Sequence, residues 1–373
     1  MMDVLELMDE WGPEKVVCVS DRRTGMKGVL VIDNTARGMG KGGTRMSPHV
    51  TVAEIARLAR VMTWKWAGVD LFFGGAKAGI VFDPSSPDKE AALRAFARKL
   101  SNEVPREYVL GLDMGLTERD AAIVQDELSD RGAMMGAPAQ LGGLPYDELG
   151  VTGYGVAEVA DELVELRGKR VAVQGFGAVG AAAAKRFAEL GAVVVAVSSV
   201  HGALVDAGGL DVARLLKLRA EFGDLAVRQY GGVRALGAEL RVPCDVLVPA
   251  ALQDVIDAEL AGELDTTLVV EGANLPTSVA AQEVLAQRGI TVVPDFIANA
   301  GGVVAAAFGM DARYSPFPVN PATVLEAVSS KLRANAVNII AEARSRGTTT
   351  HVAARELAQE RVLAAMKLRG RVA

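Results

Sequence analysis

The sequence has few residues of the kinds that build disulfides or metal sites. Its 373 residues include two cysteines, Cys18 and Cys244, and three histidines, His49, His201 and His351. Because the cysteines are far apart and lie in hydrophobic or strand-like surroundings, we expect reduced core residues of a cytoplasmic protein. The histidines lack the cysteine or carboxylate spacing of a metal site, so no metal is expected.

Long apolar runs and clusters of positive charge are also missing. No uninterrupted apolar segment has the length needed to span a bilayer, and the acidic N-terminus has no signal-peptide pattern. The formal net charge is -6 and no basic run occurs, which argues against a nucleic-acid or anionic-membrane partner. Half of the residues are hydrophobic and 23% are charged, as in a globular protein with ample core.

The most informative stretch holds a lysine among small residues. Gly74-Gly75-Ala76-Lys77-Ala78-Gly79 follows the apolar run 69–73. We expect a loop that delivers Lys77 into a cleft, because glycines allow close backbone approach. Desolvation lowers the pKa of a lysine amine and makes it useful as a general base near neutral pH. A solvated turn lysine is the alternative.

Two neighbouring segments point to the same cleft. A capping box at Thr51 predicts a helix in which Lys65 lies at the edge of the apolar stripe. A charge there needs an anion or a cavity, unless the side chain reaches water. The apolar strand 108–112 ends at Asp113, and an acid at such a strand end is a site candidate in an α/β sheet. A turn aspartate is the alternative.

A second lysine lies among glycines earlier in the chain. The segment Gly38-Met39-Gly40-Lys41-Gly42-Gly43-Thr44-Arg45 places Arg45 close to Lys41. Two cations on an exposed backbone favour binding of a carboxylate or phosphate. A mobile surface loop is the alternative.

The clearest local signal is Gly175-Phe176-Gly177-Ala178-Val179-Gly180. It lies between the apolar strand 171–174 and the helix 181–190, and a second strand covers 193–197. In this βαβ context the glycines permit a tight turn and bring a pyrophosphate to the helix N-terminus, so we predict a dinucleotide site. The acid that would bond the ribose of NAD is replaced by Ser198-Ser199-Val200-His201, which favours NADP or dual use.

The later strands repeat the apolar pattern. Runs at 246–251, 268–274 and 291–295 end in small or polar residues, and helical crossovers between them predict a parallel, doubly wound sheet. Asn274 and Asn299 stand where they could meet a cofactor amide, with turn or cap duty as the alternative.

The glycine- and proline-rich segment 132–152 is the best linker candidate. We therefore expect an α/β fold with two domains around a cleft. Residues 1–150 would form a substrate-binding and oligomerisation domain, and residues 151–320 a Rossmann domain. The remaining residues, 321–373, are expected to form two helices split at 347–350.

Together these motifs resemble the Glu/Leu/Phe/Val (amino-acid) dehydrogenase family over nearly the whole chain, with glutamate dehydrogenases nearest in pattern. The resemblance implies oxidative deamination of an L-amino acid to a 2-oxo acid and ammonia, with hydride transfer to NAD or NADP. It also implies that residues 321–373 pack back on the first domain, that the domains close, and that the chain forms a homo-oligomer, a hexamer. The matching motifs are Lys41–Arg45, Met62–Lys65, Gly74–Lys77, the Asp113 strand, Thr152–Gly155, the glycine-rich turn, Pro249–Ala251, Glu271–Asn274 and Asn299–Gly302.

The resemblance also implies roles for individual residues. Lys77 would be the general base that activates water, and Asp113 would carry a proton to and from the amine. Lys65 would hold the α-carboxylate, and Lys41 a side-chain carboxylate, which favours glutamate. Further implied positions are Gly42, Gly75 and Ala306 for the substrate, and Thr152, Gly175, Gly177, Ala178, Val179, Gly180, Ser199, Ala250, Ala251, Asn274 and Asn299 for the cofactor.

Some positions depart from the family pattern. Ala306 stands where glutamate-specific members commonly carry a serine, which favours a leucine-, valine- or phenylalanine-type substrate. Trp66 and Glu148 also replace residues that are common in the family. These changes are compatible with a catalytically weak regulatory subunit, although retention of Lys77 and Asp113 argues against that alternative.

Overall fold

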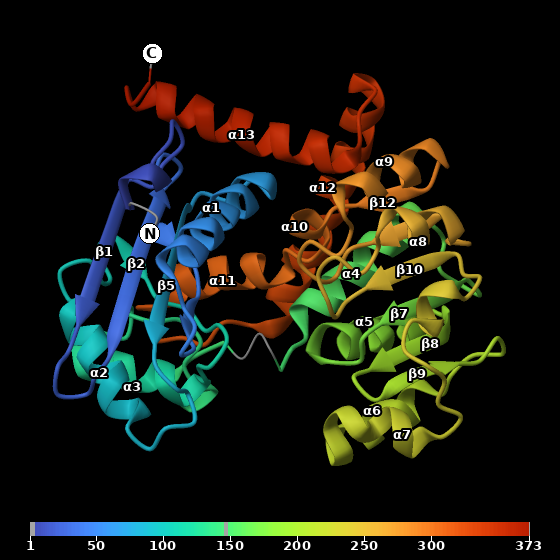
Figure 1. Ribbon diagram of the computed structural model, residues 1–373, viewed down its shortest axis with the longest axis horizontal. Coiled ribbons are helices and arrows are strands. Elements are labelled where there is room, and N and C mark those ends of the chain that lie inside the picture. Colours follow the sequence, from blue (N-terminus) through green and yellow to red (C-terminus); the bar gives the residue numbers. More distant parts are fainter. Residues whose placement is uncertain (1–3, 145–147, 373) are drawn as a thin grey trace. The chain divides into compact units, whose positions relative to one another are not determined.

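The chain folds into two α/β units, and the computed structural model describes residues 4–144 and 148–372 (Figure 1). Among the described residues no helix is both long and apolar enough to cross a membrane. The first unit comprises the described residues up to 144, with 306–321 and 357–372, and the second comprises 148–305 and 322–356.

The first unit is built on a six-stranded mixed sheet in the order β1-β2-β5-β3-β6, with β4 paired to β5. Strands β1 and β2 form an antiparallel pair near the N-terminus, and a short 3-10 helix, Val4–Leu7, precedes them. The strands are β1 (Lys15–Ser20), β2 (Lys27–Asn34), β3 (Gly40–Lys41), β4 (Thr44–Met46), β5 (Gly74–Val81) and β6 (Tyr108–Val109). The helices are α1 (Val52–Gly68), α2 (Lys89–Lys99), α3 (Glu118–Leu128) and a 3-10 helix, Ala139–Leu141.

Alternation along β2 and β5 gives the sheet two apolar faces. Leu30 and Ala78 point to the face covered by α2 and α3, and Val31 points to the face covered by α1 (Figure 1). Thr51 caps α1 by accepting a hydrogen bond from the N–H of Glu54, as the sequence predicts.

Lys77 lies within a strand, and the expectation of a loop is wrong. Ala76, Ala78 and Ile80 alternate into the core, which is the period of a strand and places Lys77 on the α1 face. The next residues on that face are glycines. A Cβ at Gly75 would lie 2.3 Å from the Thr63 nitrogen of α1, so a larger residue does not fit there. The glycines therefore serve close packing of α1 on β5.

Two further expectations for the first unit are corrected. The start of the predicted linker belongs to the hydrophobic core, because Ala133 and Met134 are fully buried and Met134 forms an isolated β-bridge with Leu110. Residues 145–147 of the predicted linker lie outside the described part of the chain. Cys18 is exposed, because it alternates outward on the edge strand β1, while Cys244 is buried.

The second unit has a six-stranded sheet in the order β12-β11-β10-β7-β8-β9. All neighbours are parallel except β9, which pairs antiparallel to β8. The strand order reverses between β7 and β10, the position at which open α/β sheets bind ligands. The strands are β7 (Arg170–Gln174), β8 (Val193–Ser199), β9 (Gly202–Val205), β10 (Val246–Pro249), β11 (Leu268–Val270) and β12 (Thr291–Val293).

The helices of the second unit surround this sheet. Residues 152–155 lie at the start of α4, which packs closely on α5, because a Cβ at Gly153 would lie 2.2 Å from the Val179 carbonyl oxygen. The helices are α4 (Val151–Leu163), α5 (Ala178–Glu189), α6 (Val212–Phe222), α7 (Ala226–Tyr230), α8 (Ala258–Glu263), α9 (Val279–Gln287) and α10 (Asp295–Ala298), with 3-10 helices at Gly223–Leu225 and Ala238–Arg241.

Three long helices complete the chain, and the predicted break between the last two is present. They are α11 (Gly301–Ala312), α12 (Pro321–Arg346) and α13 (Thr350–Leu368); α11 and α13 are divided between the two units, and all of α12 but Pro321 belongs to the second.

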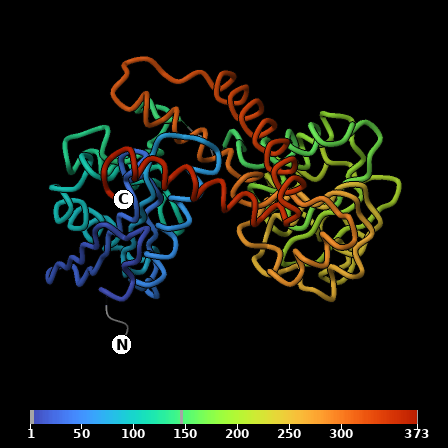
Figure 2. The backbone as a smooth tube through the Cα atoms, turned by 90° about the horizontal axis from the view of Figure 1, so that it is seen from above, coloured from blue at the N-terminus to red at the C-terminus, as the bar shows by residue number. Residues whose placement is uncertain are grey.

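The C-terminal helices do not all pack on the first unit. Residues 322–356 cluster with the second unit, because Leu332 packs on Gly155 and Arg333 pairs with Glu158 at 2.8 Å. The end of α13 joins the first unit, where Val362 packs with Ala67, and Figure 2 shows the red end of this helix on the side of the blue first unit.

Candidate functional site

An ion pair between Lys77 and Asp113 forms the centre of the candidate site in the first unit. Lys77 Nζ lies 2.6 Å from Asp113 Oδ2, and Arg45 Nε lies 3.5 Å from the same oxygen. Lys77 is held in β5, and Asp113 follows β6 in a loop. An amine and a carboxylate in direct contact can exchange a proton with each other and with a bound substrate.

The environment of Asp113 keeps its carboxylate charged. Burial by itself would raise the pKa of Asp113, but the charge and hydrogen bond of Lys77, the Met114 N–H and the charge of Arg45 outweigh burial. The pKa of Asp113 is therefore lower than usual. At neutral pH the site holds a charged acid beside a lysine.

Lys41 is a buried amine in the same region. Its residue is 3% exposed, and its Nζ donates to the carbonyl oxygens of Val109 (3.2 Å) and Leu110 (2.9 Å). Burial, with the charges of Lys77 and Arg313, lowers the pKa of Lys41 to about 7. An anion arriving here would restore the charge of this amine.

Two aromatic residues fix the backbone that carries Lys41. Trp66 Nε1 donates to the carbonyl oxygen of Lys41 at 3.1 Å, which gives a structural reason for tryptophan beside Lys65. The Tyr108 hydroxyl donates to the carbonyl oxygens of Gly42 and Gly43, and burial raises the pKa of Tyr108. The 41–43 segment is therefore anchored from α1 and from β6.

Glycines set the spacing of the cluster. A Cβ at Gly43 would lie 2.9 Å from Asp113 Cβ and 3.1 Å from Lys77 Nζ, and one at Gly111 would lie 2.7 Å from Lys41 Nζ. Gly42, predicted to bind substrate, packs against the Ala76 carbonyl oxygen, where a Cβ would overlap. Small residues here leave room for the two amines.

The remaining predicted substrate residues belong to two helices of the first unit. Lys65 lies on α1 with an intermediate exposure, and Ala306 lies on α11. Their roles in binding the substrate stay predictions.

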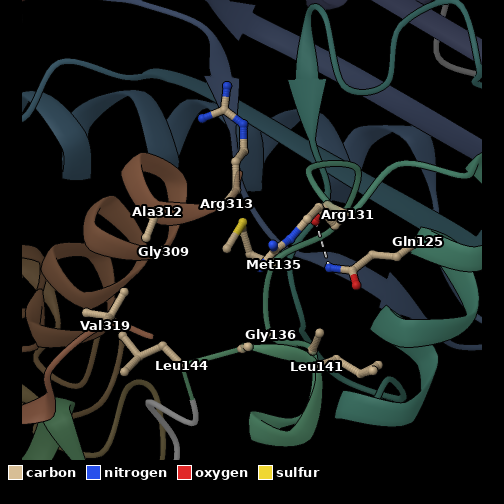
Figure 3. A pocket seen from close by; sticks show the side chains of 13 residues that line it. Gln125, Arg131, Met135, Gly136, Leu141, Leu144, Gly309, Ala312, Arg313 and Val319 are labelled. Carbon is tan, nitrogen blue, oxygen red and sulfur yellow. Dashed lines mark hydrogen bonds between the residues drawn. The ribbon is translucent and has the colours of Figure 1, made fainter. Parts of the chain in front are cut away.

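Arg313, just beyond α11, was not singled out by the sequence. It borders a small pocket together with Met135 and Gly309, and a Cβ at Gly309 would lie 2.9 Å from Met135 Cε (Figure 3). Gln125 lines the same pocket and donates to the Arg131 carbonyl oxygen (Figure 3). Lys41, Lys77 and Asp113 do not line it. Arg313 affects the candidate site through its charge on Lys41.

The glycine-rich turn of the second unit has the shape that a dinucleotide requires. Gly175 has φ of 95°, and a Cβ on it would lie 2.7 Å from Ala251 Cβ. A Cβ at Gly177 would meet nothing within 4 Å, so space remains open at the N-terminus of α5. Open space over the first N–H groups of a helix suits a pyrophosphate.

The predicted cofactor residues gather at the carboxyl edge of this sheet. Ala251 N donates to Gln174 Oε1 at 3.0 Å, which ties the ends of β10 and β7 together. The N–H of Gly175 donates to Ser198 Oγ at 2.9 Å, so the buried serine of this pair supports the turn. Ser199 ends β8, and Ala178, Val179 and Gly180 form the first turn of α5. Thr152, in the first turn of α4, approaches Gly302.

Asn299 organises the chain after β11. Its Nδ2 donates to the Gly272 and Ala273 carbonyl oxygens and to Asn274 Oδ1. Its buried Oδ1 has no hydrogen-bond donor among the described residues. An acceptor left open at this edge fits the carboxamide of a nicotinamide ring.

The buried carboxylate of Glu271 helps to hold the segment after β11 in place. Glu271 is 1% exposed, and its Oε2 accepts from the Asp295 N–H at 2.8 Å and lies 2.9 Å from His351 Nε2. Asp295 Oδ2 in turn accepts from the Leu275 N–H at 2.8 Å. His351, at the start of α13, is therefore linked to the cofactor edge.

Sequence reasoning did not identify Ser198, Arg313 or His351 as contributors. Ser198 precedes the predicted Ser199 on β8, so the alternation of side chains along the strand could have identified Ser198 as the buried serine of the two. His351 pairs with a residue 80 positions away, and no local pattern reports such a contact.

Two sequence profiles match the chain and together span most of it. The profile of the Glutamate/Leucine/Phenylalanine/Valine dehydrogenase family matches residues 142–370. The profile of the Glu/Leu/Phe/Val dehydrogenase dimerisation domain matches residues 13–130.

Individual relatives agree with these profiles. The glutamate dehydrogenase of Aeropyrum pernix is 35% identical, with 90% of this chain and 85% of the relative aligned. The NADP-specific glutamate dehydrogenase of Saccharolobus shibatae is 33% identical, with 99% and 92% aligned. Among solved structures, the hetero-hexameric glutamate dehydrogenase of Thermus thermophilus in a leucine-bound form has a TM-score of 0.84 and 31% identity, with 98% of this chain and 92% of that chain covered.

Proposed function

Because this chain belongs to the Glutamate/Leucine/Phenylalanine/Valine dehydrogenase family, we propose that its amino-acid substrate is L-glutamate. The products would be 2-oxoglutarate and ammonia, with NAD or NADP as oxidant. The observation that carries the proposal is the buried amine of Lys41 beside the Lys77–Asp113 pair. The names of the relatives support the same substrate.

Lys77 and Asp113 are proposed to perform the proton chemistry. When bound, the nicotinamide ring accepts the hydride from the α-carbon. Lys77, as general base, removes a proton from the water that attacks the substrate iminium. Asp113 takes a proton from the substrate ammonium group before hydride transfer and returns it to the nitrogen that leaves as ammonia. The 2.6 Å contact between them supports this division, because a proton can move along it without bulk water.

Lys41 is proposed to select the second carboxylate. A dicarboxylic substrate supplies a negative charge that an apolar amino acid lacks. The buried amine regains full charge when paired with that carboxylate, and charge-assisted hydrogen bonds are stronger than neutral ones. Lys65 is proposed to hold the α-carboxylate, which both classes of substrate share.

The cofactor groups are proposed to meet the second unit at its carboxyl edge. The N-terminus of α5 and the open space at Gly177 would receive the pyrophosphate. Asn299 would accept a hydrogen bond from the carboxamide with its unpaired Oδ1. Together these contacts would orient the nicotinamide.

A reductive-amination panel tests the substrate. Purified protein is given ammonia, NADH or NADPH, and 2-oxoglutarate, 4-methyl-2-oxopentanoate, 3-methyl-2-oxobutanoate or phenylpyruvate. We expect a clear preference for 2-oxoglutarate, and Lys41→Met should lower kcat/KM for it by about 10- to 100-fold. The variant should change the value for 4-methyl-2-oxopentanoate far less.

A second candidate is a leucine-, valine- or phenylalanine-type substrate, which Ala306 on α11 favours because it offers no hydroxyl for a carboxylate. Preference for an apolar oxo acid in the panel would establish it. Nucleotide binding without turnover of any oxo acid would instead establish a regulatory subunit.

We further propose that the chain forms a homo-oligomer, a hexamer, in the cytoplasm. The match to a dimerisation-domain profile supports assembly, and the unpaired thiols Cys18 and Cys244 support a reducing compartment. Size-exclusion chromatography with light scattering on the pure chain tests the first point. A monomer would contradict it.

A further inference from the structure

A pocket of about 550 Å³ lies in the first unit, at the ends of β3 and β6 that are remote from Asp113. Its walls include the segment before β3, the segment before β6 and the end of the chain after α13. Strands β3 and β6 are parallel and both begin at this pocket, whereas Asp113 follows the end of β6. A ligand held here would therefore be separate from the substrate and the cofactor of the proposed reaction.

Positive charge predominates among the side chains that line this pocket. Four of them are basic and two are acidic, namely Lys15, Arg106, Arg369 and Arg371 against Glu14 and Glu107. The basic residues come from three separate segments of the chain, and like charges gathered in this way repel one another. An anion in the pocket would relieve that repulsion.

Both acids are already paired with basic residues. Glu14 Oε1 lies 2.5 Å from Arg371 Nη1, and the same carboxylate accepts hydrogen bonds from the N–H and the hydroxyl of Thr35. Glu107 Oε2 lies 3.0 Å from Lys15 Nζ. These contacts offset the negative charge of the pocket and hold Arg371 and Lys15 in place.

Arg106 and Arg369 are the basic residues of the pocket that stay unpaired. Both are exposed, and neither guanidinium has a hydrogen-bond or ion-pair partner among the described residues. Arg106 precedes β6 and Arg369 follows α13, so the fold brings two available guanidinium groups from distant parts of the sequence to one pocket. Each offers a planar fork of donors, which matches the oxygens of a phosphate.

We propose that this pocket binds a small molecule that carries a phosphate group, with Arg106 and Arg369 as the residues that bind the phosphate. Exposed ion pairs are individually weak, so one carboxylate would be held poorly here. A phosphate ester has a charge of about −1.5 to −2 at pH 7 and three acceptor oxygens, so it offers acceptors to both guanidinium groups. Met39 lines the same pocket and provides an apolar contact for the organic part of the ligand.

Calorimetric titration of the full chain with three probes tests the pocket. The probes are inorganic phosphate, phenyl phosphate, and benzoate, which has the same ring with one carboxylate. NADP is present in excess, so that the nucleotide site of the second unit is occupied. We expect one phosphate site per chain that binds phenyl phosphate more tightly than inorganic phosphate, and benzoate at least about fivefold more weakly than phenyl phosphate.

Three variants locate the site. Arg106→Ala and Arg369→Ala should each weaken phenyl phosphate by about fivefold, as for loss of an exposed ion pair, and the double variant by about 20-fold if the effects add. Arg23→Ala removes an exposed arginine of the same unit that does not line the pocket, so it should bind phenyl phosphate like wild type.

Several results would overturn the proposal. Wild-type affinity in the double variant would place the phosphate elsewhere on the chain, and loss of phosphate binding in the presence of NADP would assign it to the nucleotide site. Equal binding of benzoate and phenyl phosphate, or no binding of either phosphate, would also contradict it. None of these measurements involves turnover, so they are independent of the outcome of the oxo-acid panel.

Discussion

Lys77 Nζ and Asp113 Oδ2 are 2.6 Å apart, and the two residues reach this contact from a central strand and from a loop that follows β6. Gly43 borders both side chains, so no larger residue separates them. The contact keeps the carboxylate charged and places the amine where its proton can be exchanged.

Lys77→Ala should abolish most turnover and spare the cofactor. Loss of a general base typically lowers the rate by about 10²- to 10⁴-fold. NADP binding should stay within about threefold, because the cofactor residues belong to the second unit. Lys99→Ala, which removes an exposed lysine of the first unit, is the control and should keep full activity. Substantial turnover in Lys77→Ala would remove this lysine from the mechanism.

The burial of Lys41 predicts a pH-dependent stability. Its folded pKa of about 7 lies below the ordinary lysine value of about 10.4, so between these values the unfolded chain binds one more proton. The stability contribution of this site therefore rises with pH across that window. Urea unfolding at pH 7, 8.5 and 10 should show Lys41→Met most stabilised relative to wild type near pH 7, with the difference shrinking towards pH 10.

The matched control for that titration is Lys99→Met, at an exposed lysine. Its difference from wild type should not vary with pH over the same range. A constant difference for Lys41→Met would show that the amine stays charged in the folded chain.

Gly43→Ala should misplace the reactive pair without touching the nucleotide. The new Cβ would lie 2.9 Å from Asp113 Cβ, which is too close, so the loop that carries Asp113 must shift. A displacement of about 1 Å in a catalytic group can lower the rate by about 10²-fold. Steady-state kinetics should show this fall, whereas Gly262→Ala, whose Cβ would meet nothing within 4 Å, should behave like wild type. Unchanged kcat in Gly43→Ala would mean that the pair tolerates the shift.

His351→Ala should lower the stability of the second unit and weaken its binding of the nicotinamide end of the cofactor. It removes a partner of the buried Glu271 carboxylate, and such a loss costs about 1–3 kcal/mol in the free energy of unfolding. The Asp295 and Leu275 contacts depend on that carboxylate, so the Kd for NADP should rise. Fluorescence titration and urea unfolding measure the two effects.

Two variants separate this effect from a general defect of α13. Arg355→Ala, at an exposed site on the same helix, should leave stability and Kd unchanged. His351→Gln keeps a donor and should recover part of both losses. If it recovered neither, the hydrogen bond to Glu271 would not be the cause.

Local sequence patterns predicted most elements and failed where packing decided. The N-cap of α1 at Thr51 and the break at 347–350 depend on neighbours a few residues away, and the structure has both. The lysine at 77 was assigned to a loop, because glycines suggested a turn, whereas they actually let α1 approach the strand. Glycine alone does not distinguish a turn from a close contact.

The sequence by itself determined the two-unit α/β plan and the strand–turn–helix for which a dinucleotide site is predicted. Both follow from periodicity and from glycines at fixed offsets, which act over a few residues. The tertiary structure alone decided that Lys41 donates to carbonyl groups 68 and 69 positions away and that α12 packs on Gly155. Such contacts arise from sheet order and helix packing, which join residues that no local pattern relates.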